Sequence, residues 1–240
     1  MILFVGDIHG RIAALASAYK DAERLGAKAI IQVGDFGIYW PGRSNDLANF
    51  FNSQDKKIPL YFCDGNHENH TVLDNFYKKQ QVNIVEVAKN CFHVRRGTTL
   101  TLFEKRILFF GGAQSYLGNS DEPFILDKNW WPREMPALEE FNLFKNKFTS
   151  ADIVVTHDCP SFLMKDKKYH DLWSKNAVPQ FLKSVSDNSN VQPTDWFFGH
   201  HHDHSMWHID AVNYYCCGKH SESWLYSETE CVKQGQRTVQ

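Results

Sequence analysis

The segment Ile2-Leu3-Phe4-Val5-Gly6-Asp7-Ile8-His9-Gly10 begins with an apolar run and ends in two side chains that can bind a metal. Four further clusters repeat this arrangement, each after a short apolar run: Gly-Asp-Phe-Gly at 34–37, Gly-Asn-His-Glu at 65–68, Thr-His-Asp at 156–158 and Gly-His-His-His at 199–202. Four of the five runs are typical of buried parallel strands. Their polar side chains are therefore expected at the carboxyl ends of strands, where open α/β sheets bind ligands. Together the clusters indicate a hydrolytic site for two metal ions.

The composition is that of a globular protein. Of 240 residues, 42% are hydrophobic and 22% are charged, which leaves no case for disorder. The net charge of −2 argues against a protein that coats nucleic acid through its overall field, although a local phosphate site is compatible with it. Without a repeat or linker, we expect a single domain over 1–226, followed by a polar, frayed tail over 227–240.

The sequence also predicts a cytoplasmic protein. The apolar start is too short for a signal peptide, and no apolar run approaches the ~20 residues that span a bilayer. The six cysteines show no C-x-x-C spacing, and the adjacent Cys216 and Cys217 would face opposite sides of a strand. We expect reduced thiols.

The first quarter of the chain predicts a parallel sheet. Strands at Ile2–Val5, Ala29–Val33 and Pro59–Cys63 alternate with helices over 11–25 and around 47–51. Such strand–helix–strand alternation is typical of parallel strands joined by right-handed crossovers.

The middle of the chain changes character. Three short runs, Cys91–Val94, Thr98–Phe103 and Arg106–Gly111, indicate an antiparallel meander, and a long loop rich in Gly, Pro and Asn follows over 112–136. Two further helices are expected, over 137–147 and near 177–185. The later strands are Ile153–Thr156 and Trp196–Phe198, followed by a hairpin of Met206–Ile209 with Val212–Cys216. The expected architecture is two sheets packed face to face with helices outside.

The ligand types within the clusters narrow the choice of metal. Asp7 and His9 are two residues apart, so in an extended segment they would point the same way, and His200 and His202 repeat this spacing. Asp35 supplies a second carboxylate that can bridge two cations. The donor set mixes nitrogen and oxygen without a thiolate, which favours manganese, iron or zinc over a soft-metal site or an all-oxygen calcium cage.

The order Asp-x-His, Gly-Asp, Gly-Asn-His-Glu, His, Gly-His-x-His, from Gly6 to His202, resembles that of the calcineurin-like metallophosphoesterase superfamily. The resemblance implies a four-layer αββα sandwich of two mixed sheets, with a dinuclear centre at the strand C-termini. By motif position, it implies one metal site made of Asp7, His9, Asp35 and His202, and a second made of Asp35, Asn66, His157 and His200. His67 would be the histidine beside the scissile phosphate that does not bind metal.

The resemblance also implies a mechanism. Two divalent or trivalent transition-metal ions, with manganese as the first choice and iron or zinc as alternatives, would polarise the phosphoryl oxygens and generate a bridging hydroxide for in-line attack. His67 could then protonate the leaving oxygen as a general acid, a role worth ~10²–10⁴-fold.

Two alternatives to a small-molecule phosphoesterase stand beside it. Protein serine/threonine phosphatases of the superfamily carry an Asp-Arg-Gly extension after the second motif, whereas this chain has Ile38-Tyr39 beyond Gly37, which counts against a phosphoprotein substrate. A catalytically silent scaffold would be expected to lose ligands, and every expected ligand is present. The few basic residues inside the motifs favour phosphodiesters of small or nucleotide-like substrates.

Substrate-binding candidates lie in the loops between the motifs. Arg43 could clamp phosphate, although a surface position is the commoner outcome. Trp130 and Trp131 could form an aromatic platform over the metal site with Arg133 on phosphate, or they could pack the long loop onto the body.

Overall fold

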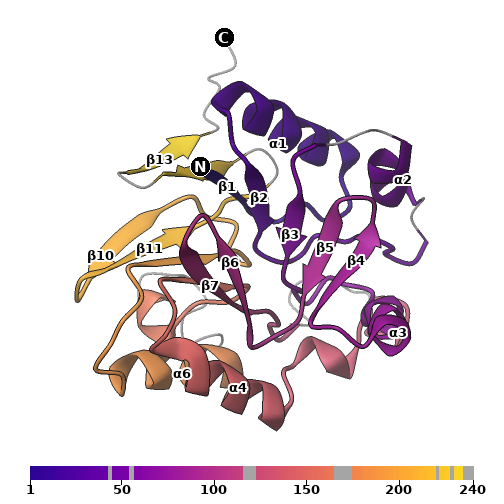
Figure 1. Ribbon diagram of the computed structural model, residues 1–240. Coiled ribbons are helices and arrows are strands. Elements are labelled where there is room, and N and C mark those ends of the chain that lie inside the picture. Colours follow the sequence, from indigo (N-terminus) through magenta and orange to yellow (C-terminus); the bar gives the residue numbers. More distant parts are fainter. Residues whose placement is uncertain are drawn as a thin grey trace.

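The computed structural model describes residues 1–42, 45–53, 57–115, 123–164, 175–219, 222–227 and 230–234. In this part of the chain, two β-sheets pack face to face, and helices cover their outer faces (Figure 1).

The larger sheet has seven strands and is centred on three parallel strands from the first quarter of the chain. Its order is β13 (Cys231–Gln234), β12 (Ser223–Tyr226), β1 (Ile2–Val5), β2 (Ala29–Gln32), β3 (Leu60–Phe62), β5 (Cys91–Val94) and β4 (Ile84–Ala88). Ile2 lies opposite Ala29, and Ile30 lies opposite Leu60, so the carboxyl ends of β1, β2 and β3 share one edge. The helices beside this sheet are α1 (Ile12–Leu25), α2 (Asp46–Ser53) and α3 (His70–Gln80).

The smaller sheet has six strands in the order β10 (Met206–Ile209), β11 (Val212–Cys216), β9 (Asp195–Phe198), β8 (Ile153–Thr156), β7 (Lys105–Phe110) and β6 (Thr98–Leu102). β7, β8, β9 and β11 are parallel, while β6 and β10 pair antiparallel at the two edges. Its outer face is covered by α4 (Leu138–Phe148) and α6 (Ala177–Asp187). Two short 3₁₀ segments, η1 (Pro132–Glu134) and η2 (Ser161–Met164), lie in the loops on this side.

Three apolar layers hold the four structural layers together. Between the sheets, the rings of Phe4 and Phe197 stack with centroids 3.6 Å apart, which joins β1 directly to β9. Leu15 and Tyr19 of α1 are buried against the outer face of the larger sheet, and Phe144 of α4 is buried against the smaller one. The central strands are apolar on both faces because both faces are covered. The predicted αββα sandwich is confirmed.

The predicted meander over 91–111 is wrong for its first strand, whereas the hairpin of its last two strands is confirmed. β5 belongs to the larger sheet, where it lies parallel to β3 and antiparallel to β4, whereas β6 and β7 form a hairpin in the other sheet. Short apolar runs indicate strands but carry no information about which sheet receives them. One α-helix, α3, and three strands, β4, β12 and β13, were not predicted.

The chain's last described strand corrects a second expectation. β13 pairs antiparallel with β12, with Cys231 opposite Tyr226 and Gln234 opposite Ser223. The expectation of a frayed tail from residue 227 is therefore wrong for Cys231–Gln234. This edge strand is polar and largely solvent-exposed, so its period-2 pattern is weak in the sequence.

The cysteines lie as the sequence suggests. Cys216 belongs to the apolar layer under α6, while Cys217 lies between the two sheets, so the pair faces opposite sides. All six cysteines are free thiols. Among the described residues, no helix combines the length and apolar character needed to cross a membrane.

Candidate metal centre

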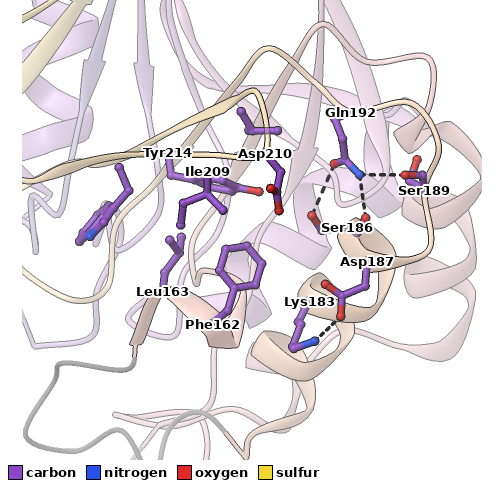
Figure 2. A pocket seen from close by; sticks show the side chains of 12 residues that line it. Phe162, Leu163, Lys183, Ser186, Asp187, Ser189, Gln192, Ile209, Asp210 and Tyr214 are labelled. Atoms are coloured by element: carbon purple, nitrogen blue, oxygen red, sulfur yellow. Dashed lines mark hydrogen bonds and ion pairs between the residues drawn. The ribbon is translucent and has the colours of Figure 1, made fainter.

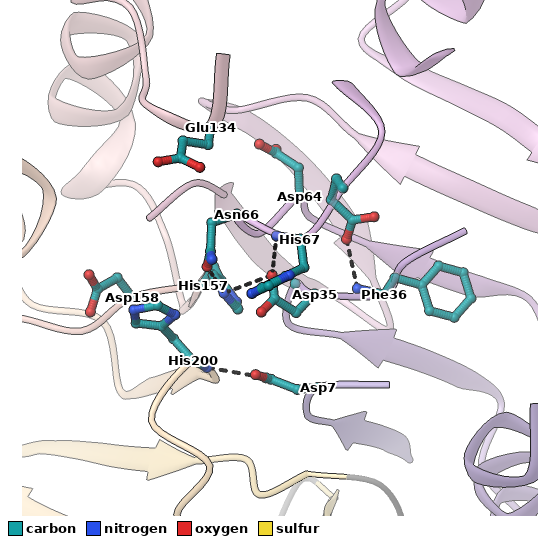
Figure 3. Close-up of polar contacts among 12 residues, drawn as sticks. Asp7, Asp35, Phe36, Asp64, Asn66, His67, Glu134, His157, Asp158 and His200 are labelled. Carbon is teal, nitrogen blue, oxygen red and sulfur yellow. Dashed lines mark hydrogen bonds and ion pairs between the residues drawn. The ribbon is translucent and has the colours of Figure 1, made fainter. Parts of the chain in front are cut away.

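The predicted ligands meet where the carboxyl ends of strands from both sheets come together (Figure 3). Asp7 and His9 follow β1, Asp35 follows β2 and Asn66 follows β3, all in the larger sheet. His157 follows β8, and His200 and His202 follow β9, in the smaller sheet. They surround a cavity of about 160 Å³, lined by His9, Asp35, Asn66, His67, Gln114, His200 and His202.

One group of donors consists of Asp7, His9 and His202. Nε2 of His202 lies 3.0 Å from Oδ2 of Asp7 and 3.1 Å from Nε2 of His9. Oδ2 of Asp7 is buried and accepts no hydrogen bond from the described residues. Atoms that bind one transition-metal ion at about 2.0–2.2 Å lie about 3 Å apart from each other, so the spacing fits a shared cation.

The second group consists of Asp35, His157 and His200, with Asn66 beside them. Nδ1 of His157 bonds the Val33 carbonyl at 2.9 Å, which turns Nε2 toward Oδ1 of Asp35 at 3.2 Å and Oδ1 of Asn66 at 3.3 Å. Because both oxygens are acceptors, a positive charge belongs between them and Nε2, supplied either by a proton on Nε2 or by a cation that its lone pair binds. This arrangement also fits a cation.

Asp35 lies between the two groups. Its Oδ1 faces His157, and its Oδ2 lies 3.9 Å from Nδ1 of His9. The carboxylate therefore lies between Asp7, His9 and His202 on one side and His157 and His200 on the other, with Asn66 beside His157.

Burial favours the neutral, metal-binding form of two of the histidines, His9 and His200. It lowers the pKa of His200 to about 4, and it lowers the pKa of His9 against the opposing charges of Asp35 and Asp7. Burial also disfavours charge on His157, but Asp35 outweighs this and raises the pKa of His157 to about 10. His157 thus sits in a strongly negative field, the environment that a bound cation needs.

His67 lies at the edge of the ligand cluster. Its backbone N–H donates to Oδ1 of Asp35 at 2.7 Å, which fixes the position of its Cα beside the bridging carboxylate. Its ring centroid is 5.1 Å from that of His9 and 5.4 Å from that of Trp40. The ring lines the cavity without belonging to either donor group.

The ligands converge through turns, which corrects the extended geometry assumed from sequence. The φ angles of His9, Asp35, His200 and His202 are 49°, 56°, 64° and 52°, in the left-handed region. Glu68 holds one of these turns, because its buried carboxylate accepts the N–H groups of Phe36 at 2.7 Å and Gly37 at 3.0 Å. Glu68 had no predicted role, and its place in the Gly-Asn-His-Glu motif was the signal that could have found it.

In the described parts of the long loop, residues 112–115 and 123–136, the two tryptophans pack onto the body, while Gln114 lines the metal cavity. Trp131 is buried, donates from Nε1 to Oγ1 of Thr71 at 3.0 Å and meets Trp40 edge to face. Trp130 stacks on Phe124. The guanidinium of Arg133 is paired with Glu140 at 2.6 and 2.7 Å, and it does not line the metal cavity. The structure thus favours the packing alternative, and Arg43 lies outside the described residues.

A larger cavity, of about 870 Å³, lies away from these ligands (Figure 2). It is bordered by α6, η2 and the β10–β11 hairpin, including Asp210 and Val212. β11 runs parallel to β9, so Val212 lies at the opposite end of the sheet from His200. No group of three metal-binding side chains lies among its described lining residues. The candidate metal centre therefore lies at the smaller cavity.

Two packed sheets with two donor groups that could each hold a metal ion, at the carboxyl ends of the strands, are the arrangement expected of a metal-dependent phosphoesterase. A family model for the calcineurin-like phosphoesterases matches residues 1–204. The chain belongs to the calcineurin-like phosphoesterase family. No curated protein sequence matches it.

Solved structures share the fold at low sequence identity. The TT1561 protein of Thermus thermophilus superposes with a TM-score of 0.59 at 16% identity over 97% of each chain. The phosphopantetheinyl hydrolase of Mycobacterium tuberculosis gives 0.54 at 13% identity, over 90% of this chain and 89% of that one. A putative 5'-nucleotidase from Staphylococcus aureus gives 0.52 at 15% identity, over 97% of this chain and 52% of the other.

Proposed function

We propose that this member of the family is a phosphodiesterase that cleaves small or nucleotide-like phosphate diesters. The observation that carries the proposal is the pair of donor groups joined by Asp35, with His67 beside them in an open cavity. Among the described residues, the lining of that cavity includes no lysine or arginine. A diester carries one charge fewer than a monoester dianion, so it needs less cationic compensation than a monoester does.

The residues would divide their work as follows. Asp7, His9 and His202 hold one ion, Asn66, His157 and His200 hold the other, and Asp35 binds both. When bound, the two ions, with manganese as the first choice for this mixed N/O set, supply Lewis-acid activation of the phosphoryl group and of the attacking water. The seven side chains would orient the ions, and four of them, Asp7, Asp35, Asn66 and His157, are buried and would shield one side of the centre from bulk water.

His67 would donate a proton to the leaving oxygen. Its ring reaches the cavity from the Asp35 side, while its backbone is held by the Asp35 carboxylate at 2.7 Å. Trp40 packs against the ring, with the two centroids 5.4 Å apart, and it is partly exposed. A planar leaving group that receives a proton from His67 would therefore lie near Trp40, which replaces Trp130 and Trp131 as the proposed aromatic contact.

A comparison of substrates and variants tests the function. We expect the manganese-loaded protein to hydrolyse bis-p-nitrophenyl phosphate faster than p-nitrophenyl phosphate. Asp35→Asn should lose activity because it removes the shared ligand, whereas His208→Ala, an exposed histidine of β10, should match wild type. Unchanged activity in Asp35→Asn would contradict the two-ion centre, and faster cleavage of the monoester would contradict the diester preference.

The leaving group separates the role of His67 from that of the ligands. His67→Ala should reduce kcat by ~10²–10⁴-fold on a diester with an alkoxide leaving group, which needs a proton. The loss should be much smaller on bis-p-nitrophenyl phosphate, because p-nitrophenolate leaves without protonation. Equal losses on both substrates would rule out the general-acid role while leaving the metal centre intact.

The six free thiols also support a reducing compartment, and we propose a cytoplasmic location. Fusion of the chain to a fluorescent protein and fractionation of the cells would test it.

A further inference from the structure

We infer that Ser115 and Glu134, from the two ends of the long loop, are positioning residues that aim the amide oxygen of Asn66 at the metal centre. The inference rests on the proposed role of Asn66 as a metal ligand. It assigns a function to the loop over 112–136 that neither an aromatic platform nor simple packing provides.

A short chain of hydrogen bonds connects the three side chains. Nδ2 of Asn66 donates to Oγ of Ser115 at 3.2 Å, and Oγ of Ser115 donates to Oε2 of Glu134 at 2.6 Å. The backbone N–H of Ser115 donates to Oε1 of the same carboxylate at 2.7 Å. Glu134 therefore holds Ser115 with both of its oxygens.

The chemistry of the three side chains determines which group donates and which accepts in each of these hydrogen bonds. An ionised carboxylate can only accept hydrogen bonds, so the Ser115 hydroxyl must donate its hydrogen bond to Glu134. Its oxygen can then only accept from Asn66, and only the NH₂ end of the amide can donate to it. The Asn66 oxygen is thereby turned to the opposite side, where it lies 3.3 Å from Nε2 of His157. Without this chain, a flip of the amide would present NH₂ to the cation.

Glu134 is in turn held to the segment that precedes Asn66. Arg96, which is buried, donates to the backbone carbonyls of Glu134 and Arg133, both at 2.9 Å. Its Nε also donates to Oδ2 of Asp64 at 2.8 Å, two residues before Asn66. A Cβ on Gly112 would lie 2.6 Å from the Glu134 carbonyl, so the other end of the loop approaches closely as well. The segments that carry donor and acceptor are thus held together by one arginine.

Metal titration of the full chain tests the inference. Mn²⁺ binding to chelator-treated protein is followed by the loss of the free Mn²⁺ EPR signal, which gives affinities for both ions. Ser115→Ala and Glu134→Gln should weaken the binding of one ion ~10–100-fold, the range typical of groups that orient a ligand. Ser115→Thr, which keeps the hydroxyl, should restore affinity, and Glu139→Gln, an exposed neighbouring carboxylate, should have no effect.

A double-mutant cycle distinguishes positioning from general support of the fold. If Ser115 acts through Asn66, Ser115→Ala should add no loss in an Asn66→Ala background. Equal losses in both backgrounds, or unchanged affinity in Ser115→Ala, would overturn the inference. Unchanged affinity in Asn66→Ala itself would instead contradict the proposed metal site. Thermal unfolding of the metal-free variants identifies any that have lost the fold, and Ser115, which is only half-buried, provides a variant that should retain it.

Discussion

Four of the proposed ligands, His9, Asp35, His200 and His202, have left-handed backbone conformations that cost about 1–2 kcal/mol each outside glycine. Hydrogen bonds from neighbouring turns hold them there. The N–H groups of Ile8 and His9 donate to the carbonyl of Asp35 at 3.1 and 2.8 Å, and Glu68 fixes the two residues that follow. At the residue scale, the directions of the metal-binding side chains therefore depend on strained turns, which hydrogen bonds from neighbouring residues stabilise.

Gly65 packs closely against the proposed ligands Asp35 and His157. A Cβ there would overlap Oδ1 of Asp35 and lie 2.8 Å from Nε2 of His157. We expect Gly65→Ala to displace the bridging carboxylate and to retain fewer than two Mn²⁺ per chain after gel filtration, measured by elemental analysis. Gly42→Ala, where the positive φ strains an alanine but no atom lies within 4 Å of the new Cβ, should retain both ions. Full occupancy in Gly65→Ala would contradict the close approach.

At the scale of elements, α4 is tied to the loop before it by one carboxylate. Glu140, buried near the start of α4, accepts from the guanidinium of Arg133, from Arg96 at 3.3 Å and from the N–H of Ala137 at 2.9 Å. Burial alone would raise the pKa of Glu140, but the hydrogen bonds from Arg133 and the charge of Arg96 lower it below its usual value. This ion pair, rather than phosphate, accounts for the position of Arg133.

Glu140→Gln should therefore destabilise the protein in a pH-dependent way. A carboxyl whose pKa is lowered in the folded state contributes stability above its unfolded pKa, near 4.3, and loses that contribution as the pH falls through the folded value. We expect a loss of about 3 kcal/mol at pH 7, which corresponds to roughly 6–12 °C in Tm.

The difference in Tm between wild type and Glu140→Gln should shrink when thermal scans are repeated at progressively lower pH below about 4. Glu139→Gln, at the neighbouring exposed position, should change Tm little at any pH. If the Tm difference between wild type and Glu140→Gln stays constant as the pH falls well below the unfolded pKa, the ionised form of Glu140 does not contribute to stability.

Sequence prediction succeeded for elements with a strong local pattern. α1 ends at Gly26, whose φ of 70° closes the helix, and the helix was predicted within a residue or two. The errors concerned strand pairing and a missed strand. β5 was expected to pair in the meander with β6, but it pairs with β3 in the other sheet. β13 was missed because its sequence does not alternate clearly between apolar and polar residues. Which strand a segment pairs with depends on distant residues that no local window contains.

At the scale of the whole molecule, the proposed ions would join the two sheets. Asp7, His9, Asp35 and Asn66 belong to loops of the larger sheet, whereas His157, His200 and His202 belong to the smaller one. The metal centre therefore crosses the sheet–sheet interface at one end of the sandwich, and the Phe4–Phe197 stack joins the same sheets within it. Metal binding should be coupled to the stability of the whole sandwich.

Adding Mn²⁺ to chelator-treated protein should raise its Tm. At 100 times Kd, one ion adds about 2.7 kcal/mol, which for a chain of this length is roughly 5–10 °C. Differential scanning calorimetry with and without Mn²⁺ measures the shift. Asp35→Asn should lose most of it and His208→Ala should keep it, while an equal shift in Asp35→Asn would show that the ions bind elsewhere.

The sequence by itself predicted the donor set, through the resemblance of its motifs, and it indicated the strand that precedes each donor and the layered α/β architecture, because these follow from local residue types and local apolar periodicity. Only the tertiary structure decided how the donors converge, through left-handed turns rather than extended segments. It also decided that Trp40 contacts His67, and that Ser115 and Glu134 reach Asn66 from a loop about fifty to seventy residues away. The physical reason is that a hydrogen bond or a ring contact depends on distance in space, which the packing of the two sheets fixes.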